Sequence, residues 1–389
     1  MSKLDQYSLR DLFIELELEL IESLKRNLKR HEREERKHGF QWEQWQRAKL
    51  RGIEEFRRNN KTLIATYHKD IMETIESVLE VEYQDAYKQS LELFDDIEMD
   101  LAGFDNSTDL GMPEVKEDNF FQVNDEKLKS LIEEMQTDFS KTDSKIMRNM
   151  DEAYKEIINK AVLKVGSGTK TIRQAVDEVS KGYLENGIDC IVYKDGKRVN
   201  IANYAEMYLR TASQRATFMA QGKVRDRIGI YTILISQHAN SCPKCLKWQG
   251  RVLIDDVFTS LTKTEALKLS RSTGYPLLST AMEEGFLHPN CRHSITTYFE
   301  DKTTKPKEFT KAEKAEALRK YYEEQRQRYY EREIRKWKRV AEGSLDDRNV
   351  DKAKDYARYY QSRLRQHIKN NPNLRRQYWR ERINPTESA

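Results

Sequence analysis

The sequence has few cysteines, few prolines and glycines, and no long hydrophobic run. Only 4 of its 389 residues are cysteine, which argues against a disulfide-rich scaffold and predicts synthesis in a reducing compartment. Proline (7) and glycine (15) are also scarce, so the chain is not a low-complexity disordered polypeptide. No stretch approaches 18 apolar residues, and Met1 is not followed by a basic and then an apolar segment. We therefore expect neither a membrane span nor a secretory signal.

Charged residues, by contrast, are abundant in the sequence. Charged residues make up 34% of the chain and hydrophobic residues 38%, and the mean hydropathy is −0.88. This composition is too polar for one thick core of such length, and it is typical of long, solvent-exposed helices. Such helices often complete their burial against a partner, so assembly with other proteins is expected.

The charges are unevenly distributed along the chain, although the net charge is only +4. Residues 70–119 contain 16 acidic residues and 2 lysines, whereas residues 305–389 contain 24 basic and 14 acidic residues. Blocks of one sign mark partner surfaces more often than catalytic sites. Both blocks are therefore expected to be partner surfaces.

Hydrophobic spacing predicts helices at both ends of the chain. The segment "LFIELELELIESL" alternates like a strand, but its apolar residues continue at helical spacing, which favours a helix. Two further helices are predicted between residues 124 and 164, and one after Thr171, which is a candidate N-cap. From residue 310 the pattern is helical again, with a break at "EGSLDD". The leading helical stripe consists of Leu9, Phe13, Leu16, Leu20, Leu24 and Leu28.

Between these helices the hydrophobic period changes. Asp195-Gly196 lies between two short β-prone runs and predicts a hairpin, and residues 229–236 and 293–300 are candidate strands. The fold class predicted is mainly α with a small α+β module, in which long N- and C-terminal helices flank a short sheet closed by a Cys/His metal knuckle. The predicted regions are an N-terminal helical region (1–112), a linker with helices leading into the core (113–187), the α+β module (188–300) and a basic C-terminal helical region (301–389); the clearest linker is 101–115.

A cysteine–histidine constellation follows the first of these strands and precedes the second. Cys242 and Cys245 form a C-P-x-C knuckle, and "GFLHPNCRHSI" adds His288 and Cys291. Together they make the Cys₃His set of a structural zinc site, with His293 and His238 as alternatives to His288. Two other interpretations stay open: reduced cysteines packed as small hydrophobes, and a redox-active CxxC, which the lack of a βαβ context disfavours.

Catalysis is not expected at this constellation. A zinc deaminase needs an H-x-E motif before its P-C-x-x-C, and here the order is reversed. Four protein ligands also leave no open position for a reactive water. Trp248 and Gly250 are expected to pack beneath the knuckle and permit its tight turn, and Arg210 is expected to be a buried, hydrogen-bonded structural arginine.

Three segments carry a family resemblance: "RTASQRA", "ISQHANSCPKCLKWQGRV" and "YPLLSTAMEEGFLHPNCRHSI". They resemble the phage minor capsid protein 2 family and, more loosely, the phage Mu F-like head morphogenesis domain, over about residues 125–345. Where more distant Mu F-like chains tend to end in HPNCRC, this chain has His293. The matched positions are Cys242, Cys245, Trp248, Gly250, His288, Pro289, Asn290, Cys291 and Arg292.

The resemblance implies a non-enzymatic minor capsid protein of a tailed bacteriophage, made in the bacterial cytoplasm. Such a protein acts in head assembly at or near the portal, inside the capsid or at the portal vertex, with a further role in genome packaging or delivery. The implied partners are the portal protein and other head proteins. Packaged double-stranded DNA is a further candidate partner, through Arg335, Lys336, Lys338, Arg339, Arg375 and Arg376.

Two alternatives from other functional classes remain. A zinc-containing nucleic-acid-binding protein outside the virion would show tight, salt-sensitive DNA binding as an isolated chain. A Mu F-like effector enzyme would need a catalytic module, but only helical residues follow the α+β module in this sequence. Turnover of nucleotide or nucleic acid would favour the enzyme.

Overall fold

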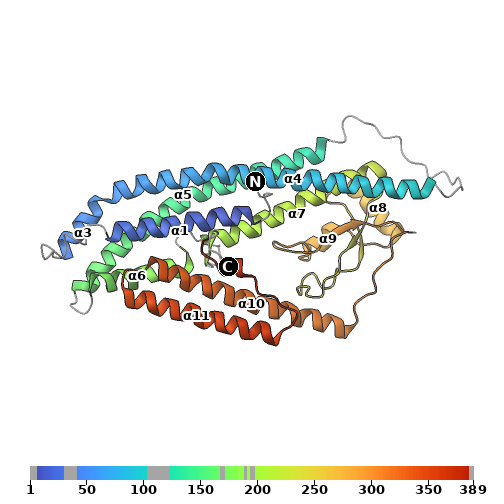
Figure 1. Cartoon of the computed structure of the whole chain (residues 1–389). Helices are drawn as coiled ribbons and strands as arrows, with labels where there is room; N and C mark the ends of the chain where they lie inside the picture. The colour runs from blue at the N-terminus through green and yellow to red at the C-terminus, as the bar shows by residue number, and fades with distance from the viewer. Residues whose placement is uncertain are drawn as a thin grey trace. The chain divides into compact units, whose positions relative to one another are not determined.

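The structure is a computed structural model that describes residues 7–29, 42–102, 122–166, 171–187, 191–192, 198–300 and 302–384. Helices dominate the described residues, and the strands are short, which confirms the predicted mainly α class (Figure 1). The predicted linker falls outside the described residues from residue 103 onward. The elements are α1 (Ser8–Lys29), α3 (Trp42–Arg51), α4 (Ile53–Ala102), α5 (Gln122–Gly166), α6 (Ile172–Asn186), β1 (Ile191–Val192), β2 (Arg198–Val199), α7 (Ile201–Ile228), β3 (Thr232–Ile235), β4 (Val252–Ile254), α8 (Lys263–Thr273), α9 (Leu278–Glu283), β5 (Ile295–Thr297), α10 (Lys311–Gly343), α11 (Asp347–Asn370) and the 3₁₀ turn η1 (Tyr378–Glu381).

The chain divides into two compact units, and each is discontinuous in sequence. Unit 1 takes in Thr74–Gln136 and Met207–Tyr322. Unit 2 takes in Tyr7–Glu73, Thr137–Glu206 and Glu323–Ala389. Unit 1 therefore holds the predicted cysteine–histidine constellation, and unit 2 holds most of the basic end of the chain.

The leading helix of unit 2 confirms the helical interpretation of the alternating N-terminal segment. All six residues of the predicted stripe are buried in α1, from Leu9 at 0% exposure to Leu28 at 5%. Phe13 packs against Phe139 of α5, with ring centroids 5.3 Å apart. Burial of each such side chain stabilises the fold by about 1.5–3 kcal/mol, which outweighs the local alternation.

Helices α4 and α5 run antiparallel within unit 2. Arg57 donates two hydrogen bonds to Asp151, at 2.7 and 2.8 Å. Eleven residues further along α4, His68 contacts Asp143 at 2.5 Å, eight residues earlier on α5. The contacts move forward along α4 and backward along α5, so the two helices are antiparallel. The two pairs also fix the register of the helices.

The prediction of two helices between residues 124 and 164 is wrong, because α5 is continuous over Gln122–Gly166. No proline interrupts this stretch, and glycine occurs only at its end, at Gly166. The Thr142 hydroxyl donates to the carbonyl oxygen of Asp138, four residues earlier. It therefore bonds back within the helix instead of capping a new one.

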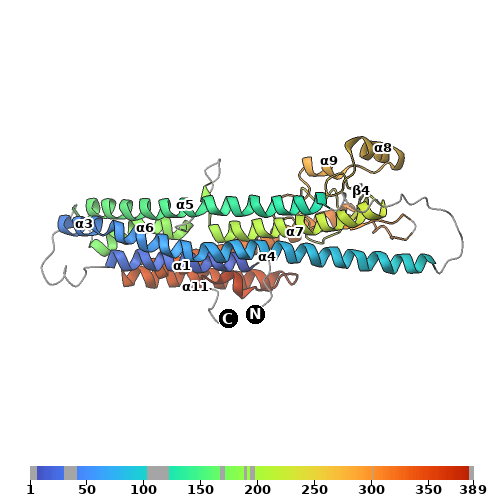
Figure 2. The same cartoon turned by 90° about the horizontal axis from the view of Figure 1, so that it is seen from above.

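The C-terminal helices of unit 2 pair as a hairpin with a capped second helix. The residues of α10 in this unit lie beside α11 (Figure 1), which Figure 2 shows from above, and Ile334 and Leu364 share one buried cluster. Asp177 of α6 accepts hydrogen bonds from the backbone N–H groups of Leu345 and Asp346, at 2.7 and 3.0 Å. The break predicted at "EGSLDD" is thus confirmed, and a carboxylate from a distant helix stabilises it.

Two smaller predictions in unit 2 are also confirmed. Thr171 caps α6 in a reciprocal capping box with Gln174, and Gly187 follows the end of the helix. The hairpin forms with β1 antiparallel to β2, Ile191 opposite Val199. The predicted turn residues themselves lie outside the described residues.

Among the described residues, no helix combines the length and apolarity needed to cross a bilayer.

Unit 1 contains a three-stranded antiparallel sheet in the order β4-β3-β5. The central strand β3 pairs Ile233 with Leu253 of β4 and with Thr297 of β5. Strands β3 and β5 lie within the predicted segments, whereas β4, α8 and α9 have no counterpart in the sequence prediction. Because β3 and β5 are antiparallel and Ile235 lies opposite Ile295, the loop that leaves β3 and the loop that enters β5 emerge beside each other.

Helix α7 is tied to the sheet by a buried ion pair and a close approach. Arg225 donates to Asp255, just after β4, at 3.1 and 2.5 Å, and both side chains are 0% exposed. Asp255 also accepts from the backbone N–H of Phe258 at 2.9 Å. A Cβ atom at Gly222 would lie 1.9 Å from the Phe258 carbonyl oxygen, so only glycine fits there.

Asp226, the residue after Arg225 on α7, is expected to make stability depend on pH. Burial raises the pKa of Asp226 to about 6, although the Ser260 backbone N–H donates to it at 2.9 Å. The native state then holds this proton more tightly than the unfolded chain, so stability falls as pH rises from about 4 to about 6. We expect Asp226→Asn to remove this part of the pH dependence in urea unfolding. Identical pH profiles for the two proteins would contradict the assignment.

Candidate metal centre

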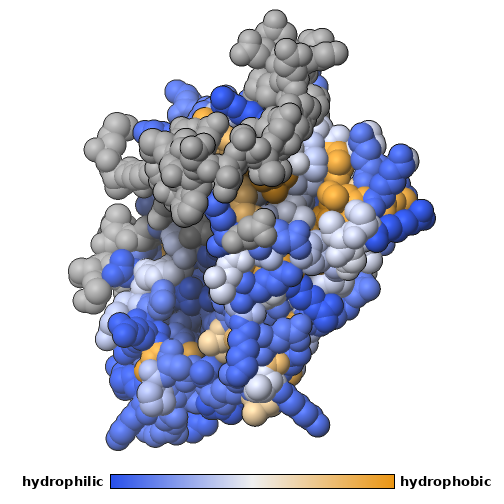
Figure 3. Space-filling model, turned by 90° about the vertical axis from the view of Figure 1, so that its right-hand side faces the viewer, coloured by the Kyte–Doolittle hydropathy of each residue, from blue (hydrophilic) through white to orange (hydrophobic). Residues whose placement is uncertain are grey.

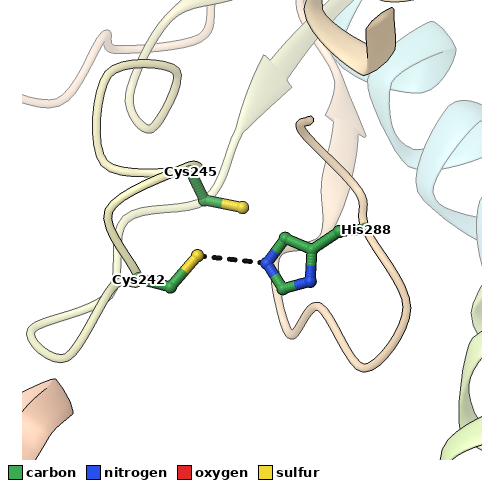
Figure 4. Close-up of side chains that lie close together, drawn as sticks. All are labelled: Cys242, Cys245 and His288. Atoms are coloured by element: carbon green, nitrogen blue, oxygen red, sulfur yellow. Dashed lines mark hydrogen bonds between the residues drawn. The ribbon is translucent and has the colours of Figure 1, made fainter. Parts of the chain in front are cut away.

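The first half of the site is a tight knuckle between β3 and β4. The backbone N–H groups of Cys245 and Leu246 both donate to the Cys242 carbonyl, at 3.2 and 3.0 Å. This turn directs the two cysteine side chains toward the same region, as Figure 4 shows. Cys245 is fully buried, and Cys242 is half-buried.

The second half is the His-Pro-Asn-Cys turn between α9 and β5. The Cys291 backbone N–H donates to the His288 carbonyl at 2.9 Å, and Asn290 has a φ of 67°. Asparagine tolerates this left-handed conformation better than most residues, which explains its place in the turn. The turn brings His288 opposite the knuckle (Figure 4).

The donor atoms form two groups that share Cys245. One group is Cys242, Cys245 and His288, and the other is Cys245, Cys291 and His293; within each, the ligand atoms lie within 4.8 Å of one another. The Cys245 and Cys291 sulfurs are 3.7 Å apart. Two thiolates on one tetrahedral zinc, with Zn–S bonds of about 2.3 Å, lie roughly 3.8 Å apart. The observed separation therefore suits a shared zinc ion.

Both histidines present a nitrogen to the sulfurs. His288 Nδ1 donates to the Pro289 carbonyl at 2.9 Å, which leaves Nε2 unprotonated in the neutral ring and 3.0 Å from Cys242 Sγ. His293 Nδ1 lies 3.5 Å from Cys291 Sγ. A thiolate and an imidazole on one tetrahedral zinc would be about 3.5 Å apart. Each ring lies close to this separation from one cysteine of its own three-donor group, and the two groups share Cys245.

The two buried cysteines of the cluster have pKa values shifted in opposite directions. The hydrogen bond between Cys245 and Cys291 lowers the pKa of Cys291 and raises the pKa of Cys245. His238 stands apart from both ligand groups, with its ring centroid 4.6 Å from that of His293, and burial lowers its pKa. His238 is thus placed near His293 without joining either ligand group.

Trp248 and Gly250 occupy the base of the knuckle. Trp248 is 5% exposed and belongs to the same buried cluster as Cys245 and Cys291. Gly250 has a φ of 72°, and a Cβ atom there would lie 2.5 Å from Gln237 Nε2. Its N–H donates to the Ile235 carbonyl, which links the knuckle to the end of β3.

Helix α7 holds the second turn in place. Arg210 Nη1 donates to the Asn290 side chain at 2.5 Å, and the Asn290 backbone N–H donates to Thr211 Oγ1 at 3.0 Å. Gln214 donates to the His293 carbonyl at 2.6 Å. Arg210 is hydrogen-bonded as expected, but it is only half-buried, because it reaches across the protein surface to the turn. Pro289 and Arg292 are exposed.

The basic residues predicted to contact DNA are not gathered into one exposed patch. Arg335 donates to the Asn203 side chain at 3.0 Å and also to the Arg380 carbonyl. Arg339 is buried and donates to the Leu184 carbonyl at 3.2 Å. These two guanidinium groups therefore serve contacts inside unit 2.

The other four predicted basic residues differ in exposure. Arg376 forms a two-point ion pair with Glu381, both contacts at 2.6 Å. Lys336 lies 3.6 Å from Glu333, and Lys338 is half-buried. Of the six residues, Arg375 is the one with an exposed side chain.

The matched family covers almost the whole chain. A family model described as phage minor capsid protein 2 matches residues 3–369. The chain belongs to this family. A protein of Lactococcus phage LL-H, named "Structural protein", is 27% identical over 235 residues, which is 59% of this chain and 61% of that protein. A "Structural protein" of Lactococcus phage mv4 is 37% identical over 102 residues, 25% of this chain and 81% of that protein.

The match to the LL-H protein thus spans less than two thirds of that relative's length. No solved structure matches this minor capsid family member. The resemblance inferred from the three motif segments is confirmed at the level of the family.

Several residues that shape the site of this minor capsid protein escaped the sequence analysis. Ser241 Oγ lies 3.3 Å from His293 Nε2, and Gln249 Oε1 lies 3.5 Å from the same nitrogen. Thr211 and Gln214 act from a helix about 80 residues away in sequence. The "RTASQRA" segment was the available signal, because it contains both of these residues.

Proposed function

We propose that this minor capsid protein is a structural, non-catalytic component of a tailed-phage head. In this proposal it is incorporated at or near the portal, contacts the portal protein and other head proteins, and assists genome packaging or delivery. The family match over residues 3–369 is the observation that carries the proposal. The printed names of the two relatives agree with a structural role.

The chemistry of the described surface supports a role in assembly. Hydrophilic residues cover most of the coloured surface in Figure 3, and hydrophobic residues are gathered in a few groups on it. Long charged helices offer extended, one-sided surfaces to neighbouring proteins instead of an enclosed substrate cavity. The cysteine–histidine group also has enough protein donors to fill a tetrahedral ion.

We further propose that a structural zinc ion is held by Cys242, Cys245, Cys291 and His288. Zinc would supply the cross-link between the knuckle and the second turn, joining the ends of β3 and β5 without disulfides. The support is the burial of Cys245 and Cys291, their 3.7 Å separation, and the placement of His288 Nε2 3.0 Å from Cys242 Sγ. Packed, reduced thiols remain the competing interpretation.

Quantitative mass spectrometry of purified phage particles tests the location. We expect the protein at low copy in full heads, and cross-links between it and the portal protein. Comparing particles before and after triggered DNA release tests delivery, since an ejected protein would be lost with the DNA. Absence from particles, with the protein free in the host cytosol, would contradict the structural proposal and favour the DNA-binding alternative.

A further inference from the structure

Helix α11 carries a concentration of exposed positive charge that the sequence prediction did not single out. Its last acidic residue is Asp355, so the following 15 residues contain no carboxylate. One row on this helix consists of Arg358, Arg365 and Lys369, which are seven and four residues apart and therefore share a side. All three are exposed.

A second row lies on the other edge of the exposed face. Lys352, Tyr359 and Arg363 are also spaced by seven and four residues, and all three are exposed. Tyr359 is 54% exposed, so its ring and hydroxyl are accessible. The two rows border the face opposite the buried residues Ala353, Ala357 and Leu364. Together they span roughly 25 Å of helix.

The cations of these rows are available to a partner. Within the described part of the chain, no residue forms an ion pair with Lys352, Arg363, Arg365 or Lys369. Arg358 is paired with Asp355, but both side chains are about 70% exposed, and such surface pairs exchange easily. This differs from Arg335 and Arg339, whose guanidinium groups are used inside unit 2.

We propose that the exposed face of α11 binds the phosphate backbone of double-stranded DNA without sequence preference. Two parallel rows of cations would lie along the polyanion, and Tyr359 would add a hydrogen bond or a sugar contact. The inference deepens the proposed function by naming the surface that meets packaged DNA. The inference rests on the proposed function in one respect: a location in the phage head is what would bring the protein to packaged DNA.

The composition of the face favours nucleic acid over an acidic protein. A stable protein interface has an apolar centre with few charges. The α11 face lacks exposed aliphatic residues between its cationic rows, where Asp355, Ser362 and Gln366 lie. Tyr356, the other exposed aromatic, already stacks on Trp337, with ring centroids 4.3 Å apart. Phosphate recognition needs no apolar centre, because released counterions drive it.

The test is duplex binding by the full-length protein, measured by fluorescence anisotropy with a labelled 30-base-pair duplex at several salt concentrations. We expect the triple variant Arg363→Gln/Arg365→Gln/Lys369→Gln to bind at least about tenfold more weakly. We also expect the slope of log affinity against log salt to become shallower by about 2–3. Circular dichroism melting of each variant checks that the fold is retained.

A matched triple variant, Arg47→Gln/Arg58→Gln/Lys61→Gln, removes the same charge from exposed positions of α3 and α4. It should bind DNA like the wild type. The proposal is overturned if the α11 variant binds unchanged, or if both triple variants weaken binding equally. It is also overturned if the α11 variant keeps duplex binding but disappears from phage particles, since the face would then contact a protein. Because binding is measured with purified protein, its failure is distinguishable from absence of the protein from virions.

Discussion

Cys291→Ser is expected to abolish stoichiometric zinc binding and unfold the sheet of unit 1. Cys291 is 5% exposed, and its sulfur lies 3.7 Å from that of Cys245, so the ion would lose a buried ligand. Structural zinc sites contribute folding free energy directly, and we expect a loss on the order of 4 kcal/mol or more. Elemental analysis and thermal unfolding measure the two effects, and Cys242→Ser should behave in the same way. Wild-type melting of both variants would exclude a structural metal.

Cys291→Ala separates the metal from packed thiols. Alanine keeps an apolar side chain at this buried position, so it should cost only about 1 kcal/mol if the thiols merely pack. If zinc is bound, alanine should be as damaging as serine. His288→Asn and His293→Asn then identify the fourth ligand, since only the variant that lacks it should lose zinc. We expect that variant to be His288→Asn.

Arg225→Met is expected to destabilise unit 1 by about 3–5 kcal/mol. Both members of the Arg225–Asp255 pair are 0% exposed, so the substitution leaves Asp255 as an uncompensated buried charge. Asp255 also holds the backbone of the loop after β4, through Phe258. Urea unfolding of the full chain measures the change.

Arg227→Met provides the control on the same helix. Arg227 is exposed, and surface substitutions usually change stability by less than about 0.5 kcal/mol. Equal midpoints for Arg225→Met and Arg227→Met would show that the buried pair does not support the fold.

Hydrophobic spacing predicted the helices well because the buried face of a helix is visible as an apolar stripe in its own sequence. The stripe from Leu9 to Leu28 needed no knowledge of its partners, and the Asp-Gly hairpin is an equally local signal. Strand β4 has only three residues, and α9 has six, too few for a period to be read. Helix α5 is continuous where two helices were predicted: no proline interrupts it, and Thr142 bonds back along the helix instead of capping a new one.

The sequence allowed the metal ligands of the candidate site to be predicted, but not the residues that hold the ligand-bearing turns in place. Cysteines and histidines are rare in this chain, so their clustering is conspicuous at residues 242–245 and 288–293. Thr211, Gln214 and Asp255 are common residue types whose partners lie 30 to 80 positions away. Charge alone could not separate Arg335, which is used internally, from Arg365, which is exposed.

The interleaving of the two units along the chain constrains how the protein can be made. Unit 2 requires residues from its first segment and from Glu323 onward, and Arg10 donates to the Trp379 carbonyl across 369 positions. Unit 2 therefore cannot be completed on the ribosome until almost the entire chain has been synthesised. Helix α1 can pack against α5 as soon as α5 has been made, but its contacts with the end of the chain must form last. A premature stop near residue 320 would leave unit 2 without α11 and most of α10.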